Sequence, residues 1–133
     1  MKILFINLPY HGHVIPTIGL VHELVKAGHK VTYLMPYDWE SKLQDSGADF
    51  LGYENNPKLD KQIRNAFLKA EEVIAAFYLL IYEQFFFVGK RLAEKHGKKC
   101  VRIFTAPATN NKLRKTRTFP ASGLTFQRTT RLS

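Results

Sequence analysis

The chain has 133 residues, of which 45% are hydrophobic, so it is long enough for one compact core and too short for two. The formal net charge is +9, but six of the 20 Lys and Arg residues and none of the 11 acidic residues follow residue 111. Most of the excess charge therefore belongs to the tail, which argues against a specific nucleic-acid-binding domain. The single cysteine, Cys100, cannot form an internal disulfide, and its apolar neighbours indicate a packed position in a strand. A reducing compartment is therefore expected.

Apolar stretches of strand length alternate with stretches of helical periodicity from the first residues, which is the pattern of consecutive βα units. Residues 2–8 predict the first strand, a helix follows Pro16 and ends at Gly28, and residues 30–35 predict the second strand. The apolar stretch at the beginning of the sequence ends at Asn7, so it is shorter than the hydrophobic region of a signal peptide.

The pattern continues in the middle of the chain. A short helix runs through Trp39 and Leu43, and residues 49–53 predict a third strand. A long helix then extends to Phe77, with Asn56 as its cap and Pro57 at its first position. Three further elements are expected, a strand over 78–82, a helix over 86–96 that ends at Gly97, and a strand over 100–104.

These elements predict one α/β domain over residues 1–110, a Rossmann-like doubly wound parallel sheet with the strand order 3-2-1-4-5. Beyond Pro107 neither helical nor strand periodicity persists, and Thr, Arg and Lys dominate. We therefore expect residues 111–133 to be a basic, disordered tail. The hydrophobic stretch 73–88 is interrupted by Glu83, and each uninterrupted piece is shorter than the about 20 residues that span a bilayer. No transmembrane segment is therefore expected.

In the expected strand order, strands one and four are neighbours where the order reverses, and ligands bind at their carboxyl ends. His13 follows the first strand, and Glu83 ends the fourth. A carboxylate that faces an imidazole can orient it to take a proton from a substrate hydroxyl. The plainer alternatives are that His13 caps the following helix and that Glu83 is a polar residue at the end of a buried strand.

Two other kinds of site are disfavoured. Residues 8–19 lack the glycine spacing of a dinucleotide-binding loop, so NAD is not expected. His11 and His13 offer two nitrogen ligands, but no third ligand is evident nearby, so no metal site is expected.

Several sequence blocks resemble the opening of macrolide-type UDP-glycosyltransferases, which are GT-B enzymes of glycosyltransferase family 1. The specific blocks are His11–Thr17, with the letters HGHVIPT, and Gly28–Tyr33, with the letters GHKVTY. A weaker likeness resumes at 80–83 and at 89–95. The resemblance covers about residues 1–110, and it implies the amino-terminal, acceptor-binding half of a two-domain fold.

The resemblance also implies roles for residues. His13 corresponds to the general base that activates the acceptor hydroxyl, and Glu83 corresponds to the carboxylate that supports it. The acceptor would lie over the segment that holds Tyr10, His11, Gly12 and Ile15. A UDP-sugar would be the donor substrate, with no further cofactor. Its binding domain has no counterpart after Pro107, so a separate donor-domain chain is a possible partner.

The chain departs from the family pattern at three places. Glu83 stands where the family has an aspartate, Ile15 stands where an asparagine is common, and the stretch between Tyr53 and Leu59 is shorter. One additional methylene in the carboxylate side chain matters, because a displacement of about 1 Å can cost about 10²-fold in rate.

The leading hypothesis is therefore a cytoplasmic, inverting hexosyltransferase that acts on a small-molecule hydroxyl and is inactive without its donor half. A truncated or frameshifted gene would also explain the basic tail. The alternative is a noncatalytic α/β module that binds a small molecule. A third reading, a polyanion-binding protein, would show affinity that collapses with salt.

Overall fold

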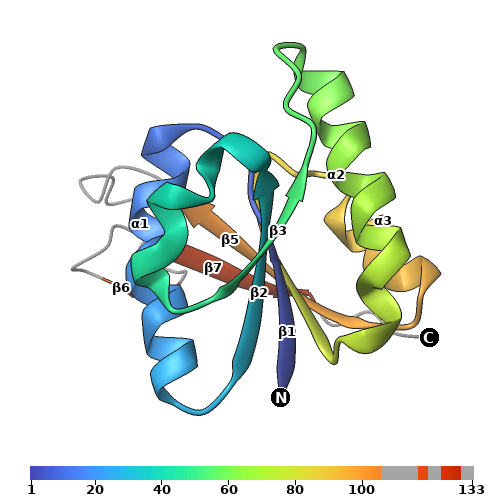
Figure 1. Ribbon diagram of the computed structural model, residues 1–133. Coiled ribbons are helices and arrows are strands. Elements are labelled where there is room, and N and C mark those ends of the chain that lie inside the picture. The colour runs from blue at the N-terminus through green and yellow to red at the C-terminus, as the bar shows by residue number, and fades with distance from the viewer. Residues whose placement is uncertain (106–116, 120–123, 130–133) are drawn as a thin grey trace.

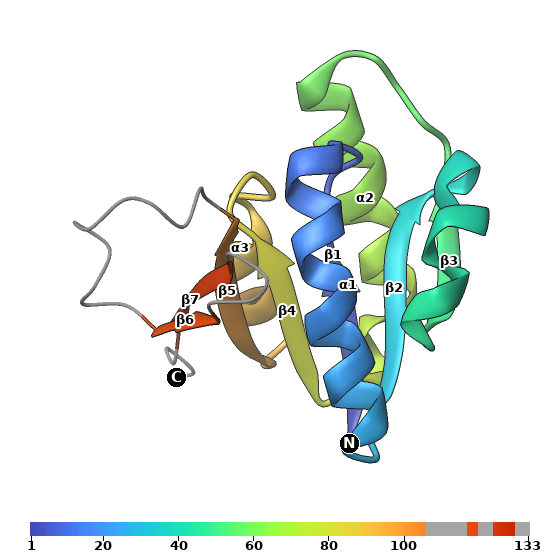
Figure 2. The ribbon, with the colours of Figure 1, turned by 90° about the vertical axis from the view of Figure 1, so that its left-hand side faces the viewer.

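The computed structural model describes residues 1–105, 117–119 and 124–129, which form an α/β fold with one central sheet (Figure 1). Helix α1 covers one face of the sheet, and α2 and α3 cover the other (Figure 2). The elements are β1 Lys2–Ile6, α1 His11–Lys26, β2 Lys30–Pro36, the 3₁₀ turns Tyr37–Trp39 and Ser41–Ser46, β3 Asp49–Tyr53, α2 Leu59–Val73, the 3₁₀ turn Ile74–Ala76, β4 Leu79–Glu83, α3 Gly89–Lys95, β5 Lys99–Thr105, β6 Arg117–Phe119 and β7 Leu124–Thr129.

The sheet has the order β3-β2-β1-β4-β5-β7-β6, and the first five of these strands pair in parallel. The predicted order 3-2-1-4-5 and the Rossmann-like fold class are thus confirmed. Strand β1 lies in the centre, where Leu4 pairs with Thr32 of β2 and with Leu80 of β4. The order reverses between β1 and β4, and this point positions the candidate site.

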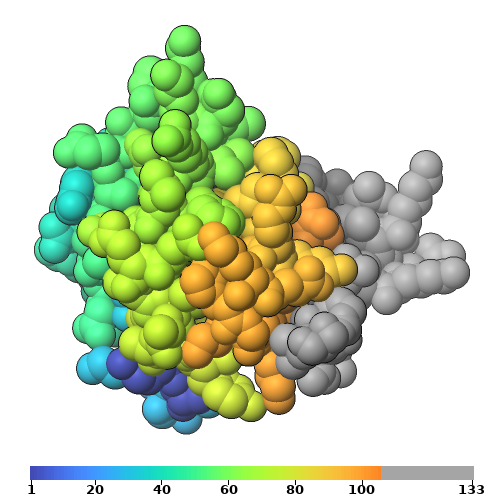
Figure 3. Space-filling model, turned by 90° about the vertical axis from the view of Figure 1, so that its right-hand side faces the viewer, coloured from blue at the N-terminus to red at the C-terminus, as the bar shows by residue number. Residues whose placement is uncertain are grey.

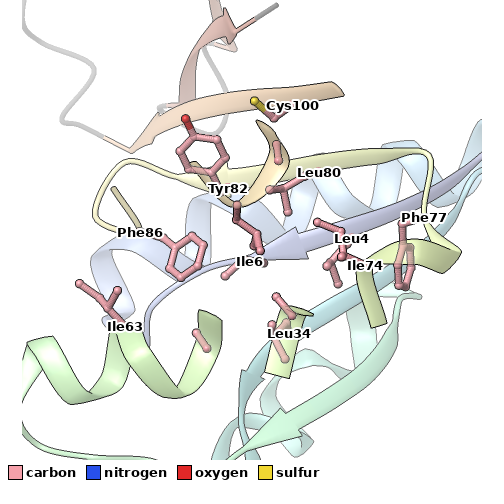
Figure 4. Close-up of a cluster of buried hydrophobic side chains, with 14 of the residues drawn as sticks. Leu4, Ile6, Leu34, Ile63, Ile74, Phe77, Leu80, Tyr82, Phe86 and Cys100 are labelled. Carbon is pink, nitrogen blue, oxygen red and sulfur yellow. The ribbon is translucent and has the colours of Figure 1, made fainter. Parts of the chain in front are cut away.

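The core consists of two layers because side chains alternate along the central strands. Leu4 and Ile6 point to the side of α2 and α3, where Leu80, Phe86 and the buried thiol of Cys100 pack with them (Figure 4). The alternate side chains of β1 point to the other face and pack with α1 and the 3₁₀ turns. Burial on both faces explains the continuously apolar strand sequences.

Helix α1 begins at His11, whereas the sequence predicted a loop up to Pro16. Tyr10 has an extended backbone, and its carbonyl accepts hydrogen bonds from the N–H groups of His13 (2.8 Å) and Val14 (2.9 Å). The first turn therefore closes before Pro16, which lies inside the helix and lacks the N–H that would bond to the carbonyl of Gly12. His13 is consequently carried by a helical turn.

Helix α2 begins at Leu59, so the prediction that Asn56 caps the helix is wrong. Lys58 occupies the cap position without a side-chain bond, and the Asn56 side chain accepts the Lys58 N–H (2.9 Å) in a turn ahead of the helix. The helix ends at Val73, and a 3₁₀ turn carries the chain towards Phe77.

Helix α3 begins at Gly89, three residues later than predicted, because a tight turn follows β4 in which the Phe86 N–H donates to the Glu83 carbonyl (2.9 Å). A side chain at position 89 would not fit. A Cβ built there would lie 2.4 Å from the ring of the buried Tyr82. This glycine lets α3 approach β4 closely.

The expectation that no regular structure follows Pro107 is wrong for residues 117–119 and 124–129. Strand β7 pairs antiparallel with β5, from Cys100 opposite Thr129 to Thr105 opposite Leu124, and β6 pairs with β7. The pairing covers the edge that β5 would otherwise expose. The other positions of the predicted tail, and the predicted domain boundary at residue 110, lie outside the described residues.

Helices α2 and α3 lie side by side on one face of the molecule (Figure 3). Glu71 of α2 joins them, because its Oε2 accepts from Lys95 Nζ (2.7 Å) and lies 3.0 Å from His96 Nε2. These two hydrogen bonds lower the pKa of the Glu71 carboxyl group below its ordinary value. Within the described part of the chain, helices are too short or too polar to cross a membrane.

Candidate functional site

The candidate site lies at the carboxyl ends of β1, β4 and β5, where the strand order reverses. Three elements contribute its polar side chains. His13 projects from the first turn of α1, Glu83 is the last residue of β4, and Thr105 is the last residue of β5. The parallel strands end at one edge, so residues far apart in the sequence meet there.

His13 and Glu83 form a direct pair, with 2.6 Å between His13 Nδ1 and Glu83 Oε2. The Glu83 side chain is fully buried, and the His13 side chain remains 20% exposed. The Phe85 N–H donates to the other carboxylate oxygen, Oε1 (2.8 Å). A buried carboxylate requires such donors. The two residues that sequence analysis placed across the crevice thus meet in the structure.

Thr105 adds a third polar group that the sequence reasoning missed. Its hydroxyl donates to Glu83 Oε2 (2.7 Å) and lies 2.6 Å from His13 Nδ1. Sequence analysis ended the fifth strand one residue earlier, at Phe104. A threonine at the carboxyl end of a strand that neighbours the strand of Glu83 was the available signal.

A second buried network anchors the start of α1. Asn7 Nδ2 donates to the His13 carbonyl (2.9 Å) and to the Tyr33 hydroxyl (3.0 Å), and Thr17 Oγ1 lies 2.6 Å from the same hydroxyl. Burial raises the pKa of the Tyr33 phenol well above its ordinary value, so this hydroxyl stays protonated. The network ties the helix that carries His13 to β1 and β2. No periodicity in the sequence predicts it.

Apolar side chains surround the exposed part of His13. The ring of Phe85 lies 4.5 Å from the imidazole, and the ring of Tyr10 lies 6.0 Å from it, centroid to centroid. Tyr10 (40% exposed) and Phe85 (42% exposed) remain accessible, and so does Ile15 on α1. The adjacent Phe86 is instead a core residue. The exposed surface around His13 therefore combines two aromatic rings with a polar imidazole.

The structure separates the other predicted acceptor residues. His11 packs against Trp39 at 4.9 Å between ring centroids, so its ring belongs to a different contact from that of His13. Gly12 has open space where a side chain would lie. In the described residues, groups of three or more His, Cys, Asp or Glu side chains that could hold a metal ion are not found.

Comparison of the sequence with known proteins finds glycosyltransferases. The chain is 33% identical over 128 residues to the NDP-glycosyltransferase YjiC of Bacillus licheniformis, an alignment that covers 78% of this chain and 32% of that protein. It is 43% identical over 51 residues to the demethyllactenocin mycarosyltransferase of Streptomyces fradiae, which covers 38% of this chain and 11% of that protein. The chain thus spans about a third of the length of YjiC. No family model matches the sequence.

Solved structures give the same result for the fold. The calicheamicin glycosyltransferase CalG4 superimposes with a TM-score of 0.70 and 27% identity, over 84% of this chain and 34% of that one. The glycotransferase of kitacinnamycin superimposes with a TM-score of 0.72 at 20% identity, over 86% of this chain and 33% of that one. The fold is therefore the Rossmann-like α/β fold found in GT-B glycosyltransferases, and in sequence the chain is similar to part of a glycosyltransferase.

Proposed function

We propose that this chain is the acceptor-binding part of an inverting glycosyltransferase that transfers a hexosyl group from a UDP-sugar to a hydroxyl of a small molecule. His13 would be the general base and Glu83 its orienting carboxylate. The observation that carries the proposal is the 2.6 Å contact between His13 Nδ1 and the buried Glu83 carboxylate. This contact leaves the opposite imidazole nitrogen, Nε2, without a partner among the described residues.

The proposed reaction is a single displacement. The acceptor hydroxyl donates a hydrogen bond to His13 Nε2, and its oxygen attacks the anomeric carbon of the donor sugar. The hydroxyl proton moves to Nε2 as the new C–O bond forms, and the nucleoside diphosphate leaves with the electrons of the broken bond. Glu83 stabilises the imidazolium that results, because its carboxylate accepts the Nδ1 proton in a hydrogen bond.

The surroundings of His13 favour an acceptor with an apolar or aromatic body. Tyr10 and Phe85 flank the imidazole, and both rings remain accessible. Such side chains hold a ligand by buried apolar area and orient it through few polar groups. The similar proteins include a glycosyltransferase named for calicheamicin and one named for demethyllactenocin, which supports a small-molecule acceptor.

The chain spans about a third of the length of YjiC, and transfer requires that donor and acceptor are held together. A donor-binding chain, separate or joined, is therefore part of the proposal. Two similar structures, the rhamnosyltransferase SpnG and the glycosyltransferase SsfS6, are complexed with thymidine diphosphate. A nucleoside diphosphate donor and a cytoplasmic location fit the proposal.

The test adds the separately produced donor-binding half of a YjiC-type enzyme to this chain, together with a UDP-sugar and a panel of aromatic acceptors. The product is measured by mass spectrometry. Transfer that requires this chain and disappears in His13→Ala supports the proposal. His22→Ala is the matched control, because His22 is an exposed residue of the same helix. Transfer that persists in His13→Ala would refute the assigned base.

A noncatalytic module that binds a small molecule is the alternative, and the accessible rings of Tyr10 and Phe85 beside His13 are the observation that favours it. It predicts that aromatic acceptors bind and perturb the resonances of Tyr10 and Phe85. It also predicts that no donor half restores transfer. Calorimetry of acceptor binding, run beside the transfer assay, separates the two functions.

A further inference from the structure

We propose that Thr105 is a positioning residue that locks the Glu83 carboxylate and keeps the imidazole proton of His13 on Nδ1. Any effect of Thr105 on catalysis depends on the function proposed above. Thr105 comes from β5, an element that contributes no other group to the pair, and it is 6% exposed. Its hydroxyl therefore lies inside the site and not on its rim.

The three polar groups form a closed triangle. Glu83 Oε2 lies 2.6 Å from His13 Nδ1, Thr105 Oγ1 lies 2.6 Å from the same nitrogen, and the hydroxyl and the carboxylate oxygen are 2.7 Å apart. Two hydrogens are available inside this triangle, one from the hydroxyl and one from the imidazole. Their positions decide the tautomer of His13.

One arrangement leaves no buried group unsatisfied. If Nδ1 carries its proton, both that N–H and the Thr105 hydroxyl donate towards Glu83 Oε2. If Nδ1 lacks a proton, its lone pair faces a carboxylate oxygen at 2.6 Å, and the two repel each other. The triangle thus selects the Nδ1–H form. In that form Nε2 carries the free lone pair that a base needs.

Thr105 also restricts the rotation of the carboxylate. The Phe85 N–H holds Oε1, and the Thr105 hydroxyl holds Oε2, so each oxygen has a donor that does not move with His13. Without the hydroxyl, Oε2 would depend on His13 alone. The carboxylate could then turn away from the imidazole, because a glutamate side chain has three rotatable bonds.

Neighbouring bonds hold Thr105 itself in place. Its N–H donates to Gln84 Oε1 (3.0 Å), and an Arg102 guanidinium nitrogen donates to the Gln84 carbonyl (3.2 Å). The ends of β4 and β5 are therefore tied together next to Glu83. The hydroxyl of Thr105 is fixed relative to the carboxylate by backbone and side chain together.

The test is the nitrogen-15 spectrum of the His13 imidazole in histidine-labelled full chain near neutral pH, which needs no sugar donor. In the wild type we expect a protonated Nδ1 and an unprotonated Nε2. Thr105→Val keeps the shape of the side chain and removes the hydroxyl, so the two nitrogen shifts should move towards each other. Thr105→Ser should restore the wild-type pattern. Thr32→Val, the same change at a half-buried threonine of β2, should leave it unchanged.

Either of two results would overturn the proposal. One is a wild-type His13 with its proton on Nε2, a result that does not depend on any variant folding. The other is a folded Thr105→Val chain whose His13 nitrogens match those of the wild type.

The role in catalysis is read separately in the transfer assay described above. Removal of the partners that orient metal-bound imidazoles changes activity by about 10- to 100-fold, and we expect Thr105→Val to lower kcat by a similar factor and leave the KM for the acceptor unchanged. A locked tautomer without any transfer would contradict the proposed function and still support the role of Thr105. Transfer with an unaltered kcat in Thr105→Val would overturn that role.

Discussion

Shortening the buried carboxylate, Glu83→Asp, is the most informative single change at the site. The substitution withdraws the carboxylate by one C–C bond, so the distance from its oxygen to His13 Nδ1 grows from 2.6 Å to about 4 Å if the backbone stays in place. This exceeds the limit of about 3.2 Å for a hydrogen bond. The bonds from Phe85 and Thr105 are lost in the same way.

The expected cost follows from the burial of the groups left behind. Each unsatisfied buried donor or acceptor costs about 1 to 3 kcal/mol, and a charged one costs more. We therefore expect Glu83→Asp to lower the free energy of unfolding by about 1 to 3 kcal/mol or more. One kcal/mol corresponds to a decrease in Tm of about 4 to 8 °C for a domain of 60 to 100 residues, and the decrease is smaller in a longer chain.

Urea denaturation followed by circular dichroism measures this difference. Glu94→Asp is the matched control, because Glu94 is an exposed residue of α3 and should tolerate the same shortening. Equal stability of Glu83→Asp and the wild type would refute the reasoning. It would mean that the three donors around the Glu83 carboxylate do not hold it in the folded state, or that the backbone moves to follow the shorter side chain.

Two further predictions concern the packing around the site. Gly89→Ala places a Cβ 2.4 Å from the buried ring of Tyr82, so overpacking should destabilise the fold by about 1 to 3 kcal/mol in urea denaturation, and an unchanged midpoint would contradict the close approach of α3 to β4. Glu71→Gln should destabilise the fold at pH 7 and have no effect in strong acid. The pKa of Glu71 is lowered in the folded state, so its contribution is present in full above the ordinary pKa of 4.5 and is lost as the pH falls through the lower folded-state value. A difference between wild type and variant that is the same at pH 7 and pH 2.5 would show that charge plays no part.

The sheet and the central pair could be predicted because they depend on regular features. Alternating strands and helices determine a parallel doubly wound sheet, and the carboxyl ends of its strands meet at one edge. His13 and Glu83 end or follow the two central strands, so their meeting follows from topology alone. Their separation of 70 positions in the sequence is no obstacle to that reasoning.

The parts that sequence reasoning missed depend on tertiary contacts. Pro16 favours the first position of a helix, but the Tyr10 carbonyl closes the first turn six residues earlier. Thr105 and Asn7 carry ordinary polar side chains at strand ends, and the only signal for Thr105 was its place on the strand next to that of Glu83. Strand β7 pairs with β5 and with the three-residue strand β6, and a basic, acid-free segment without periodicity gives no sign of either pairing.

The pairing of β7 with β5 gives residues far beyond the site an influence on it. Leu124 lies directly opposite Thr105 in the antiparallel register. The register decides which backbone positions of the two strands are paired, so a slip of one position would change the backbone partner of Thr105. Any change that shifts this register, such as a deletion of one residue between β6 and β7, would alter the support of the strand that presents the hydroxyl. The position of the Thr105 hydroxyl next to the Glu83 carboxylate would then depend on the alignment of a strand that lies far from both residues in the sequence.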